Sequence, residues 1–240
     1  MMKQLAQRLL GPVTLLLLAL TFILGLWVTP PDKVQGNLAR LLYVHPAIAW
    51  VALYVSFGTA TIASALYLWK RTRSVVMDRV AHSAMEVSTV FIVLTLITGS
   101  IWGRPTWGVW WAWDARLTST AILGLFALAY LALRRANDDP DLRARRAAVF
   151  AIIAAINVPI IHFSVDWWNT LHQGATVFTE NGQLLVHGLM LWTLFISLVA
   201  FTLLFFWLLR ARYRLEVQRA DRYDASLEEA LTLRRREGVH

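Results

Sequence analysis

The sequence predicts an all-α integral membrane protein, a bundle of six transmembrane helices with both termini on the cytoplasmic side. Of its 240 residues 58% are hydrophobic and only 16% are charged, which is too few charges to cover a soluble domain of this size. Six apolar stretches are long enough to cross a bilayer, and positive charges gather in alternate connecting segments. Cysteine is absent, which excludes disulfides and thiolate metal sites and leaves metal chemistry to histidine, carboxylates or a cofactor.

The first apolar run, Leu9 to Val28, predicts a retained membrane span rather than a cleaved signal peptide. At about 1.5 Å per residue this run matches the ~30 Å hydrocarbon core of a bilayer. It continues into Thr29-Pro30-Pro31 without the small-x-small cleavage site of a secretory signal.

Each of the six stretches is expected to be helical, because backbone polar groups cannot remain unpaired in lipid. The expected spans are roughly 9–29, 46–69, 80–102, 117–134, 147–165 and 184–209. Pro46 suits the first turn of the second helix, with His45 near its N-cap. Pro159 predicts a kink in the fifth span.

The distribution of positive charge predicts the orientation. Of the 23 Lys and Arg residues, 19 fall in one set of segments and 4 in the other. The larger set is Lys3, Arg8, Lys70, Arg71, Arg73, Arg79, Arg134, Arg135, Arg143, Arg145, Arg146, Arg210, Arg212, Arg214, Arg219, Arg222, Arg234, Arg235 and Arg236; the smaller is Lys33, Arg40, Arg104 and Arg116. By the positive-inside rule the larger set is cytoplasmic. The net charge of +8 therefore indicates topology and contact with anionic lipid, not nucleic-acid binding.

The chain is expected to hold one membrane domain, 1–210, followed by a cytoplasmic tail, 211–240. The tail has helix-forming composition with scattered apolar positions, which predicts a helical extension lying on lipid or on a partner. The segments 30–45, 103–116 and 166–183 are then extracytoplasmic.

A tryptophan-rich segment, 102–119, carries five of the twelve tryptophans within twelve residues. If 107–114 is a short helix, then Trp107, Trp110, Trp111 and Asp114 share one face by their spacing. Such a face is a rigid aromatic platform for a large planar ligand. The alternative is an interfacial aromatic belt, which suits tryptophans at span ends but does not explain a cluster in one loop.

Two histidines, His45 and His172, lie in the outer segments on either side of the tryptophan-rich one. Neutral imidazole is well suited to axial ligation of haem iron, and bis-histidine ligation takes one imidazole from each side of the ring. A single histidine at a helix end is more often a cap or a surface group. Two that bracket a tryptophan-rich loop on one side of the membrane favour ligation.

The run Trp-Gly-x-Trp-Trp-x-Trp-Asp-x-Arg-Leu-Thr-Ser (107–119) resembles the signature of the tryptophan-rich (WWD) haem-handling family of cytochrome c-type biogenesis. The sequences Tyr-x-His-Pro around His45 and Trp-Trp-Asn-Thr-Leu-His-Gln around His172 match the family too. The resemblance covers nearly the whole chain except the tail. Six spans and 240 residues are similar to the small haem-exporting members rather than to the larger haem lyases.

The resemblance implies a haem site on the periplasmic side of a bacterial inner membrane. In this family the histidines matching His45 and His172 are the axial iron ligands of haem b (iron protoporphyrin IX). The implied cradle comprises Trp107, Trp110, Trp111, Trp113, Asp114 and Arg116. The implied partners are a membrane-tethered periplasmic haem chaperone, the ATPase and membrane subunits of an ABC transporter, and a small single-span subunit. The implied role is to deliver haem for covalent attachment to the chaperone. In this role the chain is not expected to be a conventional enzyme.

Several other charged residues and histidines lie in or near the predicted spans and outer segments. Arg40 or Arg116 pairs either with a haem propionate or with lipid phosphate or Asp114. Glu86 is the only carboxylate inside a predicted span, and its place near the cytoplasmic interface favours snorkelling or a partner contact over catalysis. His162 is expected near the site, and His187 is expected to be buried early in the sixth span.

Two other functions compete with haem delivery. A b-type electron-transfer cytochrome keeps its haem, but usually places its ligand histidines within the spans. A cofactor-free permease needs polar groups or broken helices near mid-membrane, and the spans show little of either. Haem transfer to an added chaperone domain separates delivery from electron transfer.

Overall fold

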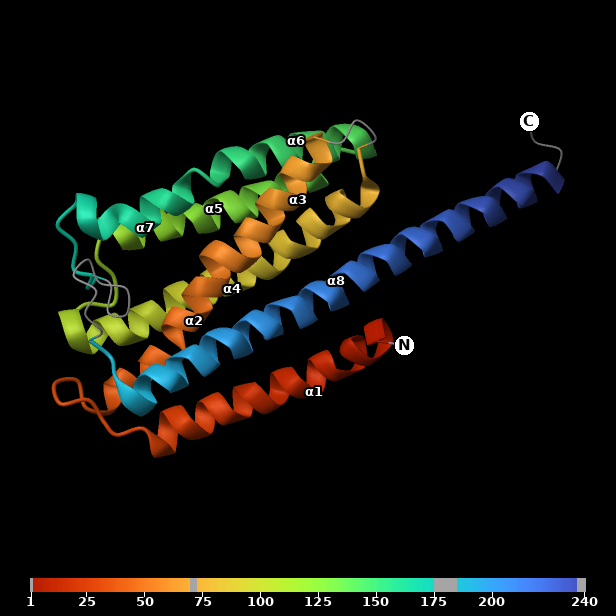
Figure 1. The fold of residues 1–240 in the computed structure, drawn as a ribbon. Coiled ribbons are helices and arrows are strands. Elements are labelled where there is room, and N and C mark those ends of the chain that lie inside the picture. Colours follow the sequence, from red (N-terminus) through yellow and green to blue (C-terminus); the bar gives the residue numbers. More distant parts are fainter. Residues whose placement is uncertain (1, 70–72, 175–184, 237–240) are drawn as a thin grey trace.

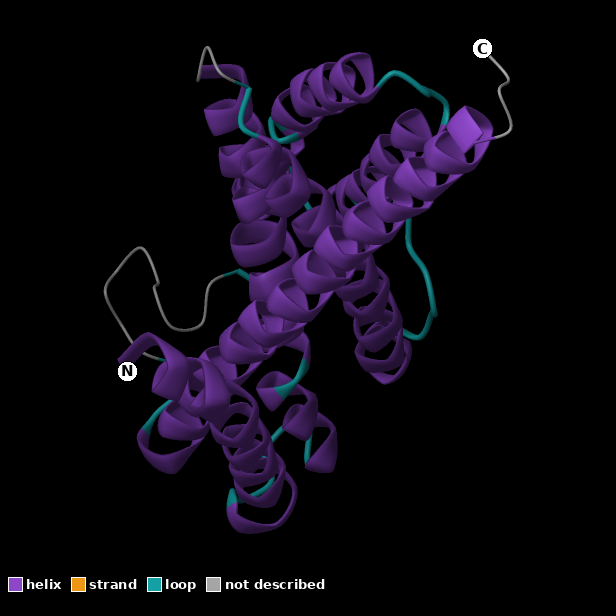
Figure 2. Cartoon of the chain, turned by 90° about the vertical axis from the view of Figure 1, so that its right-hand side faces the viewer, coloured by secondary structure: helices purple, strands orange, loops and turns teal. Residues whose placement is uncertain are grey.

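The computed structural model describes residues 2–69, 73–174 and 185–236, and these residues form an elongated helical bundle (Figure 1). The α-helices are α1 (Met2–Ile23), α2 (His45–Trp50), α3 (Phe57–Trp69), α4 (Val75–Trp107), α5 (Ala115–Arg135), α6 (Pro140–Ala154), α7 (Asn157–Trp167) and α8 (Gly188–Arg236). The described residues also form two π-helical segments, η1 (Leu24–Val28) and η3 (Val51–Ser56), and one 3-10 helix, η2 (Asn37–Tyr43). The described residues contain helices and loops but no strand (Figure 2).

Six helical segments of the described residues are long and apolar enough to cross a membrane, which confirms the predicted number. They are Arg8–Val28, Asn37–Trp69, Val75–Trp107, Ala115–Arg135, Pro140–Trp167 and Gly188–Arg236. Part of the expected sets lies outside the described residues: Lys70 and Arg71 of the positive set, 175–183 of the third outer segment, 184 at the start of the sixth span, and 237–240 of the tail.

Successive spans run in opposite directions, so the connections alternate between the two ends of the bundle (Figure 1). One end carries the connections that follow η1, α4 and α7, and is called the tryptophan end below. The other end, called the tail end, is the one toward which both chain termini lie (Figure 1). This arrangement places the described parts of the three predicted outer segments at one end, as their alternation requires. That the tail end faces the cytoplasm stays a prediction from charge.

The core between α3, α4, α5, α6 and α8 combines small residues with a few large ones. Its fully buried members include Phe57, Ala60, Ala84, Met85, Phe91, Ile92, Leu123, Ala127, Ala147, Ala151 and Phe205. Helices in lipid gain little from apolar burial alone, and small residues let their backbones approach closely. The alanines of this core serve that close approach.

The fifth span is broken between α6 and α7, which confirms the predicted kink. Pro159 lacks the N–H that would bond to the carbonyl of Ala155, and its ring crowds that carbonyl. The break therefore lies at residues 155 and 156, one turn before the proline. The buried Asn157 side chain donates to the backbone oxygen of Ser119 at 2.8 Å and joins the break to α5.

Helix α8 runs for 49 residues, or about 74 Å at the usual rise, far more than a membrane span needs. Its last buried residue is Phe205, and every residue from 221 to 236 is exposed. The tail is therefore a helical continuation of the sixth span, as its composition predicts.

Ionic contacts join the helices toward the tail end. Arg134 of α5 donates to both carboxylate oxygens of Asp78 on α4, at 2.5 and 2.9 Å. Glu86 of α4 pairs with Arg212 of α8, and His82 lies 3.6 Å from Glu216. Since Arg212 also lies 3.7 Å from Glu216, a cation already occupies the space between the two carboxylates. This group links α4 to α8, and Glu86 is an inter-helix ion-pair partner.

Candidate functional site

The tryptophan-rich segment begins as helix and then leaves it. Trp107 is the last residue of α4, and Gly108 takes a left-handed conformation (φ 80°) while its N–H bonds to the Arg104 carbonyl at 3.0 Å. Residues 109–114 form no helix. The expected short helix over 107–114 is therefore wrong, and Trp107, Trp110, Trp111 and Asp114 do not share a helical face. A glycine that accepts positive φ ends the helix at this point.

The irregular segment presents two indoles to the surroundings. The side chains of Trp110 and Trp113 are 61% and 83% exposed. Trp111 is half-buried, and its ring centroid lies 5.6 Å from that of Trp113 in an edge-to-face arrangement. Trp107 is half-buried against Gly103, where any larger residue would clash with the indole. Exposed indoles, one of them in contact with a half-buried indole, form a surface suited to a planar ligand.

Asp114 ties the segment that carries His172 to the start of α5. One carboxylate oxygen accepts from the backbone N–H of Leu117 at 2.8 Å and caps α5. The other oxygen accepts from the backbone N–H of Leu171 at 3.1 Å, fifty-seven residues away. A single side chain therefore fixes two of the three outer segments to each other.

Arg116, two residues after Asp114, reaches the same segment from the first turn of α5. Its guanidinium donates to the backbone oxygen of His162 at 2.7 Å and to the hydroxyl of Ser164 at 3.3 Å. A third nitrogen, Nη1, lies 3.4 Å from Nδ1 of His172. Arg116 thus joins α5 to α7 and places a positive charge beside the His172 ring.

Nδ1 of His172 has two competing neighbours: the backbone oxygen of Gln173 at 3.0 Å, which can only accept, and the Arg116 guanidinium at 3.4 Å, which can only donate. The shorter contact with the carbonyl favours the tautomer in which Nδ1 carries the proton. The lone pair is then on Nε2. Burial lowers the pKa of His172 below its ordinary value of 6.5, and the nearby Arg116 cation lowers this pKa further, against the opposing effects of Gln173 and Asp114. The ring centroid lies 6.2 Å from that of Trp107.

His45 is the first residue of α2, and its ring packs on the side of α4. Pro46 follows it in the first turn, as expected. Its Nδ1 lies 2.9 Å from the hydroxyl of Thr98, and its ring stands edge-on to Trp102 with centroids 5.9 Å apart. A Cβ on Gly99 would lie 3.1 Å from Cε1 of His45, so glycine there permits the close approach.

The two histidines therefore lie against the same end of the same helix. His45 contacts Trp102 and His172 contacts Trp107, and these indoles are five residues apart on α4, about 7.5 Å along its axis. The structure brings the eight residues singled out in the sequence to the tryptophan end.

Arg40 is engaged elsewhere in the described structure. Its guanidinium donates to the backbone oxygen of Gly25 at 2.7 Å and to the side-chain oxygen of Asn37 at 3.1 Å. It thus joins the π-helical end of the first span to η2.

His162 lies beside the site, as expected, whereas His187 is not the buried group that the sequence suggested. The ring of His162 is hydrogen-bonded to the Tyr54 hydroxyl at 2.5 Å, and its carbonyl holds Arg116. His187 is exposed and precedes the first turn of α8.

Thr98 contacts His45 and Tyr54 contacts His162, and neither contact was predictable from the sequence. Thr98 is one of several threonines on α4, and only the packing of α2 against that helix shows which of them meets His45.

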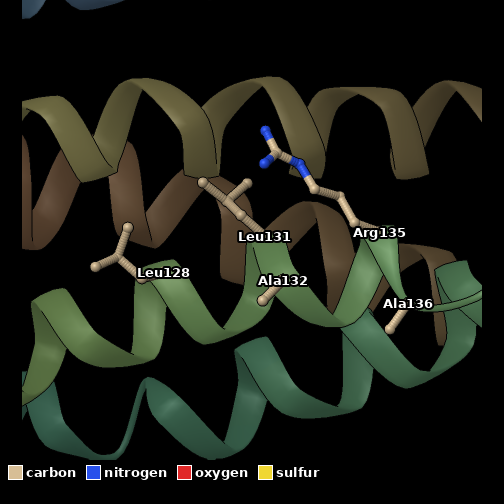
Figure 3. Close-up of a pocket in the computed structure, with 5 residues that line it drawn as sticks. All are labelled: Leu128, Leu131, Ala132, Arg135 and Ala136. Atoms are coloured by element: carbon tan, nitrogen blue, oxygen red, sulfur yellow. The ribbon is translucent and has the colours of Figure 1, made fainter.

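Two depressions accompany these helices in the described part of the chain. A groove of about 390 Å³ runs between α4 and α5 beneath Trp111 and Trp113, and its remaining lining is apolar apart from Thr89 and Thr118. A second hollow, of about 470 Å³, is lined by Leu128, Leu131, Ala132, Arg135 and Ala136 of α5 (Figure 3). This second hollow lies toward the tail end, away from both histidines, and its mainly apolar lining suits contact with lipid.

The donor set at the tryptophan end fits a planar metal complex. Two imidazoles lie at this end, exposed indoles lie between them in sequence, and a guanidinium lies near one ring. Histidine that ligates iron usually donates its other ring N–H to a fixed acceptor, which is the arrangement seen for His172.

Comparison with known proteins agrees with this chemistry. Residues 1–228 match the family model described as Heme exporter protein C. The Heme exporter protein C of Bradyrhizobium diazoefficiens is 44% identical over 214 residues, covering 88% of this chain and 78% of the relative. That of Haemophilus influenzae is 39% identical over 215 residues, covering 87% and 83%. That of Escherichia coli K12 is 38% identical over 189 residues, covering 78% and 75%.

Proposed function

The chain belongs to the Heme exporter protein C family, and from this premise we propose that it binds haem between His45 and His172 and delivers it for c-type cytochrome maturation. The haem is cargo, and haem b is the form proposed. The recipient is a membrane-tethered periplasmic haem chaperone. The site lies on the periplasmic side of a bacterial inner membrane, in agreement with the charge distribution of the chain.

One observation supports the site above the others. His45 and His172 come from segments far apart in the sequence, yet each packs on a tryptophan of the last two turns of α4. The hydrogen bond of His172 to Gln173 leaves its Nε2 free for iron. Imidazole nitrogen is a usual axial ligand of haem iron.

The remaining residues have separate roles in the proposal. Trp110 and Trp113 offer exposed rings that pack on the face or edge of the porphyrin, while Trp107 and Trp111 support them. Asp114 and Arg116 hold the His172 segment against α5. A rim position leaves one edge of the ring accessible to the chaperone, whose own side chain forms the covalent bond in this proposal.

The proposed assembly includes other subunits of the cytochrome c maturation system. We expect the ATPase and membrane subunits of an ABC transporter and a small single-span subunit. The α8 extension would then lie on the same side of the membrane as the ATPase. Membrane domain 1–210 carries the haem site, and the tail from 211 onward is the cytoplasmic extension of its last helix in this proposal.

The test is the spectrum of the purified protein and of two variants. Wild type loaded with haem should show a low-spin bis-histidine Soret band, and a pyridine haemochrome assay should identify haem b. His45→Ala and His172→Ala should each lose the bis-histidine spectrum. Retention of that spectrum in either variant would remove the altered histidine from the iron.

A second measurement separates delivery from electron transfer. Loaded protein is mixed with the soluble domain of a haem chaperone, and covalent haem on that domain is measured after denaturing gel electrophoresis. Transfer supports delivery. Haem that stays on this chain while cycling between oxidation states supports a b-type electron-transfer cytochrome.

A further inference from the structure

The hydroxyl of Thr98 on α4 lies 2.9 Å from Nδ1 of His45 and has a second partner. Thr98 Oγ1 lies 2.7 Å from the backbone oxygen of Leu94, one turn earlier in the same helix. A carbonyl oxygen can only accept, and a hydroxyl has a single proton. The proton of Thr98 is therefore directed to Leu94, and its oxygen lone pair faces His45.

This assignment determines the proton position on His45. If Thr98 accepts, Nδ1 of His45 is the donor and carries the ring proton. The lone pair is then on Nε2, the same tautomer that the Gln173 carbonyl favours on His172. Two unrelated acceptors, a helix side chain and a loop carbonyl, thus favour the same unprotonated nitrogen, Nε2, on both histidines.

Close packing around the ring restricts its orientation as well. Gly99 follows Thr98, and a Cβ at that position would approach Cε1 of His45 to 3.1 Å. Trp102, one turn further on, stands edge-on to the ring at 5.9 Å between centroids. Thr98, Gly99 and Trp102 of α4 therefore together contact this imidazole and restrict its orientation.

We propose that Thr98 is the positioning residue of the haem ligand His45: its hydroxyl accepts the Nδ1–H, so that Nε2 is unprotonated, and Gly99 leaves space for the ring. The proposal rests on the proposed function, since it assumes that His45 binds iron. Partners that orient a ligating histidine typically contribute a 10- to 100-fold effect on metal affinity, roughly the size expected at this position.

The first test uses the haem-free protein, so it does not depend on loading. Histidine ring nitrogens are labelled with ¹⁵N, and the tautomer of His45 is determined by NMR, with the signal assigned through His45→Gln. Wild type and Thr98→Ser should show the Nδ1–H tautomer. Thr98→Val removes the acceptor and should shift His45 toward a mixture of tautomers, with His172 unchanged.

The second test measures haem affinity and the spectrum of the loaded protein. Thr98→Val should lower haem affinity by about 10- to 100-fold and change the low-spin electron paramagnetic resonance signal, while Thr98→Ser restores both. Thr95→Val is the matched control, because Thr95 is buried on the same helix and donates only to the Phe91 carbonyl, at 2.8 Å. This control should bind haem like wild type.

A further variant covers the case in which Thr98→Val does not fold. Gly99→Ala keeps the hydroxyl but adds a methyl group against the ring, and should reduce haem affinity while the Nδ1–H tautomer persists. Wild-type tautomer and affinity in Thr98→Val, or equal losses in Thr98→Val and Thr95→Val, would overturn the proposal. If His45→Ala itself keeps a bis-histidine spectrum, the ligand assignment of the proposed function fails instead.

Discussion

The second carboxylate oxygen of Asp114 accepts a hydrogen bond from the backbone N–H of Leu171 at 3.1 Å, while the first caps α5 through Leu117. Leu171 directly precedes His172. The acidic residue of the tryptophan-rich signature therefore fixes the position of a segment that carries a histidine, far away in the sequence. The two tasks of this carboxylate can be separated by mutation.

Asp114→Asn should keep the cap of α5 and release the His172 segment. Asparagine is as good an N-cap as aspartate, since its side-chain oxygen can still accept from Leu117. Its amide nitrogen would then face the Leu171 N–H, donor against donor. We expect near-wild-type thermal stability in detergent with clearly reduced haem occupancy.

Asp114→Ala is the companion variant. It removes both contacts, and loss of the cap alone should destabilise the protein by about 0.5–2 kcal/mol. Equal haem occupancy in Asp114→Asn and wild type would show that the Leu171 contact does not matter for the site.

Arg116→Ala and Arg116→Lys should both lower haem occupancy, with lysine intermediate. The guanidinium joins the His162 carbonyl, the Ser164 hydroxyl and the neighbourhood of His172, and a single ammonium cannot span these positions. Haem is quantified per purified chain after loading. Full occupancy in both variants would remove Arg116 from the site.

The number of spans was predictable from the sequence, because the length and hydropathy of each stretch can be judged by themselves. The alternation of positive charge between successive connections also predicted that the three outer segments lie at the same end of the bundle. The hypothesis of a helix over 107–114 was wrong, because the glycine after Trp107 ends the helix whatever the spacing of the tryptophans that follow. Gly108 at positive φ and Asp114 as a cap are both local signals that the sequence contains.

Partners that come from other helices were not predictable. The register of α2 against α4 brings His45 to Thr98, and the contact of Glu86 with Arg212 depends on how α8 packs on α4. Such registers are set by packing of the whole bundle, which no short stretch of sequence encodes. The same holds for Arg40, whose partner Gly25 lies on the preceding span.

Trp110→Ala and Trp113→Ala should weaken haem binding without affecting the fold. Both indoles are largely exposed, so their removal leaves no cavity. An aromatic contact contributes about 0.5–1.5 kcal/mol beyond its buried area, and each variant should lose several-fold in haem affinity. Trp69→Ala is the control, since Trp69 is 89% exposed at the end of α3, away from the site. A loss as large in Trp69→Ala would point to a general effect of tryptophan removal.

Arg134→Ala should destabilise the bundle while leaving the haem spectrum unchanged. Arg134 and Asp78 form a bidentate pair, with side chains only 7% and 14% exposed. Removing one partner of such a buried pair typically costs about 3–5 kcal/mol, because the remaining charge is unpaired. The combined variant Asp78→Asn with Arg134→Met should be less destabilised than Arg134→Ala, as measured by thermal unfolding in detergent. An altered Soret band in a folded Arg134→Ala protein would contradict the separation of this pair from the site.

His172 should stay neutral at pH values where an exposed histidine is already protonated. Burial lowers its pKa below 6.5 in the folded protein, while an unfolded chain takes up the proton near 6.5. As the pH falls below about 6.5, the unfolded state therefore binds more protons than the folded state, and the contribution of this group to stability decreases. A ¹⁵N titration of the haem-free protein, with His172 assigned through His172→Gln, should show a midpoint below 6.5. The His172→Gln protein should in turn lose less stability between pH 7 and pH 5 than wild type. A His172 midpoint above 6.5 would mean that Asp114 and the Gln173 carbonyl outweigh burial at this ring.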